Sequence, residues 1–110
     1  MAACNMSEER VTLQMIKEAQ ERLKGVAQKT GLSYSNSVSD LAGCEVYLKL
    51  ENLQRTGSFK LRGAYNKVAS LTPEEREKGV IAASAGNHAQ GAALAASESG
   101  CQSVICIPTH

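Results

Sequence analysis

The stretch that decides the fold is Thr56-Gly57-Ser58-Phe59-Lys60-Leu61-Arg62-Gly63-Ala64, in which Lys60 stands at the start of a predicted helix. A second segment, Ser84-Ala85-Gly86-Asn87-His88-Ala89-Gln90-Gly91, follows one β-α repeat later and opens another predicted helix. A lysine amine can form an imine, and a turn of small residues before a helix can bind an anion. The two segments together indicate an imine-forming amine beside an anion-binding turn.

The residues around Lys60 have the hydrophobic patterns of a strand followed by a helix. Val46, Leu48 and Leu50 alternate with polar residues, which predicts a half-buried strand leading into the loop before Lys60. Ser58 is a candidate N-cap for the helix that follows. The apolar side of that predicted helix consists of Leu61, Ala64, Tyr65, Val68 and Leu71.

A β-α-β unit is predicted after this helix. Thr72-Pro73-Glu74-Glu75 has the pattern of a capping box with proline at the first helical position, and Gly79 ends this short helix. Residues 80–83 are predicted as a short buried strand, 87–99 as an alanine-rich helix and 103–107 as another strand. Parallel strands of this kind need a right-handed crossover and a sheet of more than two strands.

The residues before this unit predict one helix and one irregular segment. Apolar residues recur at helical spacing behind Thr12, a candidate N-cap, so a helix is predicted over 12–28, ending near Gly31. We expect this helix to cover a face of the sheet. Residues 31–43 are rich in serine, asparagine and glycine and are predicted as loop or edge structure.

The composition is that of one modest globular domain. The chain has 110 residues, of which 43% are apolar, and a net charge of +1. Basic and acidic residues are interspersed and only 4% of residues are aromatic, which argues against a nucleic-acid partner. No apolar stretch reaches the roughly 20 residues that span a bilayer, and residues 1–10 do not resemble a signal peptide. We therefore expect a cytoplasmic protein without a membrane partner.

The cysteines do not form a metal-binding pattern. Cys4, Cys44, Cys101 and Cys106 are irregularly spaced, and the two histidines do not complete a ligand set with them. We expect reduced thiols, with Cys106 buried in a strand, and no metal site.

Lys60 is the candidate for imine chemistry. A lysine taken alone is most often an exposed, solvated side chain. The neutral amine that attacks an aldehyde is favoured by partial burial and by the positive end of a helix dipole, and we expect both at this position. With its flanking residues, Lys60 fits a pyridoxal phosphate site.

The segment from Ser84 to His88 is the candidate anion-binding turn. Free backbone N–H groups and the helix dipole converge there, and the carboxylate of an amino acid would fit. The spacing equally allows a tight strand-to-helix turn in which Gly86 and Gly91 only permit close packing. A Walker A loop is excluded because two alanines follow Gly91, and a Rossmann fingerprint is absent.

These motifs resemble the threonine dehydratase (threonine ammonia-lyase) family of fold type II pyridoxal phosphate enzymes. The resemblance extends from about Thr12 to Pro108, and Glu51-Asn52-x-Gln54-Arg55-Thr56 is similar to the short catabolic branch. It implies the α/β fold of the tryptophan synthase β-like enzymes, a three-layer architecture built on a parallel sheet. Cysteine and threonine synthases are disfavoured because they typically place Asp-Arg directly after the lysine, where this chain has Leu61-Arg62.

The resemblance also implies roles for individual residues. Lys60 would bind the cofactor as an imine and serve as the acid and base at the substrate Cα. Phe59 would lie against the pyridine ring, although it could be an ordinary core aromatic, and Asn87 would hydrogen-bond the phenolic oxygen. The substrate carboxylate would be received by Ser84, Ala85, Gly86 and His88. His88 could instead only order the first helical turn.

A nucleotide effector is a further implication of the catabolic branch. A nucleoside monophosphate would bind near Arg55, Thr56 and Gln90. The same residues could equally be polar loop and helix-cap groups. Isoleucine-inhibited biosynthetic control and nucleotide-activated catabolic control are both left open.

The reaction that the resemblance implies is a β-elimination on a small amino acid. L-threonine would lose its β-hydroxyl as water, with pyridoxal 5'-phosphate as the electron sink, and the aminoacrylate-type product would then be hydrolysed to 2-oxobutanoate and ammonia. L-serine, giving pyruvate, is expected as a second substrate because one methyl group allows a pocket only about 1–3 kcal/mol of discrimination. Within the fold, serine racemase and serine dehydratase are the alternative activities, although Ala85 with Ala89 looks more like a threonine dehydratase.

The resemblance places the chain in the front part of a larger, homo-oligomeric enzyme. Residues 1–52 would belong to the large cofactor domain. Residues 53–110 would form the lysine helix and the first, incomplete β-α-β unit of the smaller domain. The family's phosphate-binding glycine loop lies downstream of the matching region, so we expect the truncated chain to be inactive alone. A non-catalytic remnant that pairs with a full-length paralogue is the other possibility.

Overall fold

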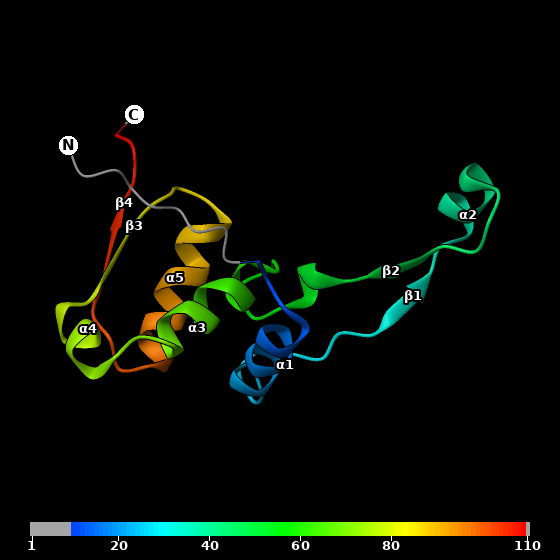
Figure 1. Cartoon of the computed structure of the whole chain (residues 1–110). Helices are drawn as coiled ribbons and strands as arrows, with labels where there is room; N and C mark the ends of the chain where they lie inside the picture. The colour runs from blue at the N-terminus through cyan, green and yellow to red at the C-terminus, as the bar shows by residue number, and fades with distance from the viewer. Residues whose placement is uncertain (1–9, 110) are drawn as a thin grey trace, which may run out of the picture.

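The computed structural model describes residues 10–109 as a small α/β body with a projecting arm (Figure 1). The helices are α1 (Leu13–Arg22), α2 (Asn36–Ala42), α3 (Lys60–Ala69), α4 (Pro73–Lys78) and α5 (Asn87–Glu98), with a 3-10 helix, η1, at Glu51–Leu53. The strands are β1 (Leu32–Tyr34), β2 (Tyr47–Lys49), β3 (Val80–Ala83) and β4 (Ser103–Cys106).

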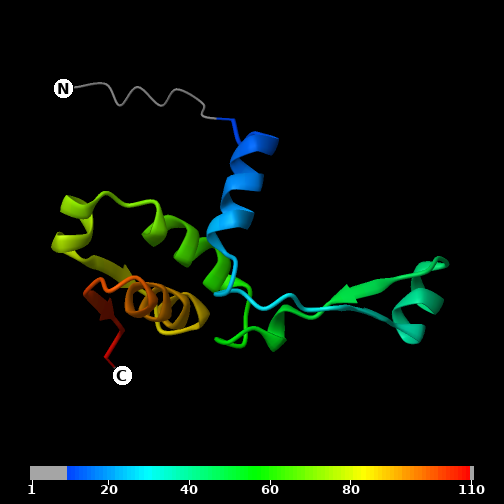
Figure 2. The same cartoon turned by 90° about the horizontal axis from the view of Figure 1, so that it is seen from below.

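The body consists of the β3-α5-β4 unit with α3 packed against α5 (Figures 1 and 2). β3 and β4 are parallel, in a register that runs from Val80 opposite Ser103 to Ala83 opposite Cys106. This confirms the parallel β-α-β unit predicted from the sequence. The small core joins α3 to α5 and the turn after it, and it contains Val68, Ala95, Ala96 and Cys101.

The sheets of the described residues are smaller than expected. Each has two strands, whereas the parallel pair was predicted to need more. Ile81 is 74% exposed and Val104 59% exposed, so the prediction of a buried strand at 80–83 was wrong. Cys106 is also exposed, and the buried cysteine is Cys101. The physical reason is that α5 covers one side of β3 and β4 while no described element covers the other side. Cys4 lies outside the described residues.

The arm consists of β1, α2 and β2 and extends away from the body (Figure 1). β1 and β2 are antiparallel, with Leu32 opposite Lys49 and the rings of Tyr34 and Tyr47 edge to face at 5.3 Å between centroids. The sequence predicted only loop or edge structure over 31–43, so α2 was missed. β2 is shorter than predicted and exposed rather than half-buried. The arm gives the Cα trace a radius of gyration of 17.5 Å, against about 13 Å for a compact chain of this length.

α1 is shorter than predicted and does not cover a sheet. Thr12 is its N-cap, as expected, and its side-chain oxygen accepts a hydrogen bond from the Met15 N–H at 3.2 Å. The helix ends at Arg22 because the chain turns through Leu23 to Gly25, which has a φ of +79°. None of its residues is buried, and its neighbour in the body is α3.

The junctions around α4 confirm the predicted capping box. The Thr72 hydroxyl accepts from the Glu75 N–H at 3.2 Å, and the Glu75 carboxylate accepts from the Thr72 N–H at 2.8 Å. Pro73 occupies the first helical position and Gly79 ends the helix. This short element therefore delivers the chain from α3 into β3 in the predicted manner.

Residues 10–109 contain neither a membrane-spanning helix nor a metal-binding cluster. Among the helices in that range, none has both the length and the apolar character that crossing a membrane requires. No group of three or more histidine, cysteine or acidic side chains there could hold a metal ion.

Candidate active site

Lys60 is the first residue of α3, as the sequence predicted. The residue before it, Phe59, is the N-cap and makes no side-chain capping hydrogen bond. Ser58, the predicted cap, does not fill that role: its hydroxyl oxygen is buried and has no hydrogen-bond partner. Lys60 is exposed rather than partly buried, because the loop before it leaves the start of the helix uncovered. Its amine is accessible to a ligand that approaches from solvent.

The Phe59 ring lies beside the Lys60 ammonium group. The nitrogen is 5.2 Å from the ring centroid, within the range of a cation–π contact. Phe59 is 58% exposed among the described residues and is not part of their core. An amine and an exposed aromatic face therefore stand together at the start of α3.

Gly91 brings α5 against the start of α3. A Cβ atom at this buried glycine would lie 3.0 Å from the Lys60 carbonyl carbon and 3.1 Å from the Leu61 nitrogen. Only a residue without a side chain allows the two backbones to approach so closely. The Lys60 backbone therefore contacts α5 at Gly91, which lies about one helical turn after Asn87, the first residue of that helix.

The turn from Ser84 to Gly86 connects β3 to α5. The Ser84 N–H donates to the Cys106 carbonyl at 3.0 Å, and the Gly86 N–H donates to the Ser84 hydroxyl oxygen at 3.2 Å. Ala85 and His88 are exposed, as is Asn87. The first N–H groups of any helix have no intrahelical acceptor, so those at the start of α5 are available to an anion. The turn for which anion binding was predicted thus lies one helical turn of α5 from Gly91, which contacts the Lys60 backbone.

The three predicted effector residues lie in different surroundings. The Arg55 guanidinium donates to the Glu98 carboxylate at 2.6 Å, at the last residue of α5. Gln90 is exposed in the first turns of the same helix, about 12 Å along its axis from Glu98. The Thr56 hydroxyl donates to the Ser58 carbonyl at 3.4 Å. The Arg55 charge is therefore directed towards the end of α5 opposite to Gln90.

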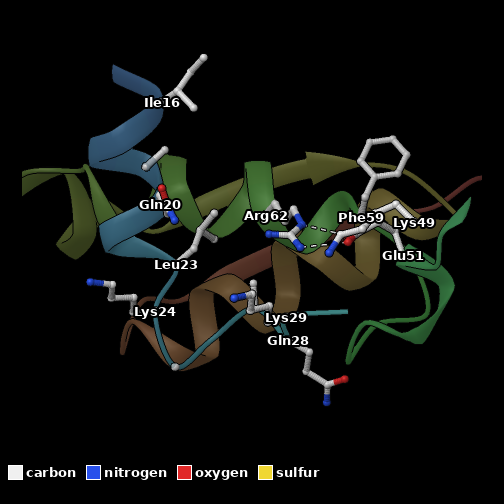
Figure 3. A pocket seen from close by; sticks show the side chains of 13 residues that line it. Ile16, Gln20, Leu23, Lys24, Gln28, Lys29, Lys49, Glu51, Phe59 and Arg62 are labelled. Atoms are coloured by element: carbon white, nitrogen blue, oxygen red, sulfur yellow. Dashed lines mark hydrogen bonds and ion pairs between the residues drawn. The ribbon is translucent and has the colours of Figure 1, made fainter. Parts of the chain in front are cut away.

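An ion pair between Arg62 of α3 and Glu51 of η1 was not predicted as part of the site. Arg62 donates two hydrogen bonds to the Glu51 carboxylate, from Nε at 2.7 Å and from Nη2 at 2.9 Å, and Figure 3 shows both. The Thr30 hydroxyl also donates to Glu51, at 3.0 Å. The bonds from Arg62, opposed by desolvation and helped by Thr30, lower the pKa of the Glu51 carboxyl from 4.5 to about 2. The carboxylate is therefore charged throughout the neutral range.

Glu51 and Arg62 both belong to motifs noted in the sequence, but the sequence did not predict that they form an ion pair. Glu51 and Arg62 are 11 positions apart, a spacing that brings no pair together within one helix or strand. Their meeting depends on the 3-10 helix at Glu51–Leu53, which carries no strong sequence signal. Two opposite charges near the ends of a predicted loop are the only hint that could have suggested the pair.

A groove of about 870 Å³ runs from α1 to the start of α3 (Figure 3). One wall is the apolar side of α1 and the turn after it, and the other is formed by the residues before α3. The residues that line it are Ile16, Ala19, Gln20, Leu23, Lys24, Gly25, Ala27, Gln28, Lys29, Lys49, Glu51, Phe59 and Arg62. The groove therefore connects Phe59 and the Glu51–Arg62 pair with the N-terminal helix.

Comparison with protein families gives a match over most of the chain. Residues 23–110 match the model of the family described as "Pyridoxal-phosphate dependent enzyme". The chain is 59% identical to an L-threonine ammonia-lyase of Thermotoga maritima over 100 residues, which are 91% of this chain and 25% of that protein. It is 50% identical to the catabolic L-threonine dehydratase of Escherichia coli strain K12 over 98 residues, covering 89% of this chain and 30% of that protein.

Solved structures show the same fold. The serine racemase of Dictyostelium discoideum superposes with a TM-score of 0.84 and 44% sequence identity, over 89% of this chain and 32% of that one. The chain thus spans about a quarter to a third of the length of the proteins it matches. The matched region includes Lys60, the turn before α5 and α5 itself.

Proposed function

Because this chain belongs to the family of pyridoxal-phosphate dependent enzymes, we propose that the protein carrying it dehydrates and deaminates L-threonine to 2-oxobutanoate and ammonia. The observation that carries the proposal is the contact of Gly91 with the backbone of Lys60, which sets an accessible amine beside the start of α5. The names of the threonine ammonia-lyase and dehydratase relatives support the choice of substrate.

The residues at the start of α3 and α5 fit the cofactor. Lys60 offers an exposed primary amine, Phe59 an exposed aromatic face for the pyridine ring, and Asn87 an exposed carboxamide for the phenolic oxygen. When bound, pyridoxal phosphate withdraws electrons from the substrate Cα and so makes its proton acidic. These three residues are proposed to hold it.

The chain's own residues have two further tasks in this proposal. The loop of Ser84, Ala85, Gly86 and His88 receives the substrate carboxylate and fixes the Cα against α3. The Ser84 and Gly86 N–H groups already donate to Cys106 and to the Ser84 hydroxyl, so the donors in this proposal are the N–H groups of Ala85 and His88. Lys60 Nζ takes the proton from Cα as a general base and, as the acid, can return it to the departing β-hydroxyl, which leaves as water. Hydrolysis of the unsaturated product by one water then gives 2-oxobutanoate and ammonia. An amine that is accessible and adjacent to the carboxylate-binding turn is suited to this transfer.

The structure also supports the proposed division between two domains. The arm ends at η1, and its two strands form a sheet separate from that of β3 and β4. We assign residues 1–52 to the large cofactor domain and 53–110 to the smaller domain, with the boundary at η1. A homo-oligomeric state, a cytoplasmic location and a nucleotide effector at Arg55, Thr56 and Gln90 stay predictions from the sequence.

The test of the proposed function is the product formed from each amino acid. With pyridoxal phosphate and L-threonine, the protein carrying this chain should release 2-oxobutanoate and ammonia. L-serine should give pyruvate with a kcat/KM within about 10- to 200-fold of that for L-threonine, because the substrates differ by one methyl group. Formation of D-serine from L-serine without ketoacid would contradict the dehydratase proposal. It would support the racemase alternative, since the serine racemase of Dictyostelium discoideum has the same fold.

Asn87→Ala should lower turnover by about 10- to 100-fold, because a hydrogen bond to a charged oxygen contributes about 1.5–3 kcal/mol. The matched control is Asn36→Ala, which changes the first residue of α2 on the distant arm. Steady-state kinetics and the equilibrium constant for cofactor binding should separate the two variants. Equal kinetics in both would show that Asn87 only begins the helix.

A further inference from the structure

The first turn of α3 carries Lys60 but lacks the usual N-terminal stabilisation. Its N-cap, Phe59, has no side-chain hydrogen bond, and the buried hydroxyl of Ser58 has no partner. Capping side chains normally satisfy one of the free N–H groups of a helix and so stabilise its first turn. A helical turn without this stabilisation frays readily unless another contact holds it.

The Glu51–Arg62 pair is placed to provide that contact. Arg62 is the third residue of α3, and its two parallel hydrogen bonds to one carboxylate fix the guanidinium in plane and direction. Residues two apart in a helix point in directions about 200° apart around its axis. Arg62 therefore leaves the helix on a side nearly opposite to that of Lys60.

The Glu51 carboxylate is itself firmly anchored. The Glu51 side chain is 18% exposed, and its carboxylate accepts hydrogen bonds from the Thr30 hydroxyl and from Arg62. The Lys49 ammonium donates to the Thr30 carbonyl oxygen. Gln54, at the C-terminal end of η1, is buried and makes two hydrogen bonds to the Gln28 backbone, at 2.9 and 2.7 Å. η1 is thus bound to residues 28–30 and provides a fixed point.

We propose that the Glu51–Arg62 pair is a positioning element that sets the rotation of the first turn of α3 and so directs Lys60 towards the start of α5. Gly91 sets the separation of the two helices at Lys60, and the ion pair prevents the turn from rolling about that contact. Glu51 and Arg62 act through Lys60, and the inference rests on the proposed role of that lysine.

The test uses Glu51→Gln, which removes the charge and keeps the shape, in the full protein that carries this chain. The matched control is Glu21→Gln, which breaks the exposed Lys24–Glu21 ion pair of α1. Covalent capture of pyridoxal phosphate is measured by borohydride reduction and peptide mapping. We expect Glu51→Gln to lower the rate of capture at Lys60 by about 10-fold, the loss of roughly one charged hydrogen bond, relative to capture at other lysines. The control should leave this ratio unchanged.

Two further measurements separate positioning from a merely structural role. Arg62→Lys keeps the charge but cannot make the two-bond contact, so it should lose selectivity for Lys60 while remaining folded by circular dichroism. The reversed pair, Glu51→Arg with Arg62→Glu, should recover part of the loss. Unchanged selectivity in folded Glu51→Gln and Arg62→Lys proteins would overturn the inference.

Amide hydrogen exchange without cofactor distinguishes this inference from the proposed function. Protection of the Arg62 amide, which donates to the Phe59 carbonyl at 3.0 Å in the first turn of α3, should fall by about 10-fold in Glu51→Gln and stay unchanged in Glu21→Gln. If the unsubstituted protein fails to capture the cofactor at Lys60, the proposed function fails, whereas the exchange result still decides whether the pair holds the turn. Equal exchange in both variants would overturn the positioning role.

Discussion

Lys60→Ala should abolish both the attachment of pyridoxal phosphate and the release of 2-oxobutanoate from L-threonine. The substitution removes the amine at the start of α3, beside Phe59 and in backbone contact with Gly91. Other lysines lie elsewhere on the surface, and none of them is held against the start of α5 by such a contact within residues 10–109. We expect turnover to fall by at least about 10⁴-fold, since a covalent attachment point and a general base are lost together.

The matched control for this substitution is Lys67→Ala. Lys67 is an exposed lysine in the last turn of the same helix, so its loss changes the charge of α3 without changing the site. The visible absorbance of bound cofactor and the rate of ketoacid release should be lost in the Lys60 variant and kept in the control. A Lys60→Ala protein that retained both signals would show that another amine carries the chemistry.

Those parts of the fold that depend on local sequence signals could be predicted. The capping box of α4 follows from side chains within one turn of the junction. The starts of α3 at Lys60 and of α5 at Asn87 follow from the helical patterns after them, although the cap expected at Ser58 was wrong. The parallel pairing of β3 and β4 followed from the length of the crossover that joins them. Local stereochemistry is visible in a sequence because the interacting groups are neighbours along the chain.

Features that depend on distant contacts could not be predicted. α2 has an N-cap in Ser35 but only a short apolar pattern at Val38, Leu41 and Ala42, so its serine-rich sequence indicated a loop. Hydrophobic patterns show which side of β3 or β4 could be buried, not whether anything covers it, and Ile81 and Cys106 are exposed for this reason.

The same limit applies to the candidate site. The motifs singled out Lys60 and the turn from Ser84 to His88 because their residue types suit imine and anion chemistry, and the family resemblance added Phe59 and Asn87. They could not show that Lys60 is exposed, that the Ser58 hydroxyl has no partner or that Arg62 binds Glu51. Each of these facts depends on how η1 and α5 meet α3 in space.

Gly91→Ala should disrupt the close contact between α5 and the start of α3. In an open helix the change would stabilise the protein by about 0.5–1 kcal/mol, because alanine loses less conformational freedom than glycine. At Gly91, however, the new Cβ would lie 3.0–3.1 Å from backbone atoms of Lys60 and Leu61, which cannot rotate away as a side chain can. Overpacking of this kind costs about 1–3 kcal/mol, so we expect a net loss of about 1–2 kcal/mol in the free energy of unfolding.

The loss of activity in Gly91→Ala should exceed what the loss of stability explains, because the contact sets the position of Lys60. α5 can relieve the clash only by moving away from α3, and a displacement of about 1 Å at a reacting group can lower turnover by about 100-fold. The control is Gly63→Ala in α3, where a Cβ would meet no atom within 4 Å and the propensity gain should appear alone. Urea unfolding and steady-state kinetics on both variants provide the comparison. If Gly91→Ala were as stable and as active as Gly63→Ala, the close approach of the two helices would not be what holds Lys60 in place.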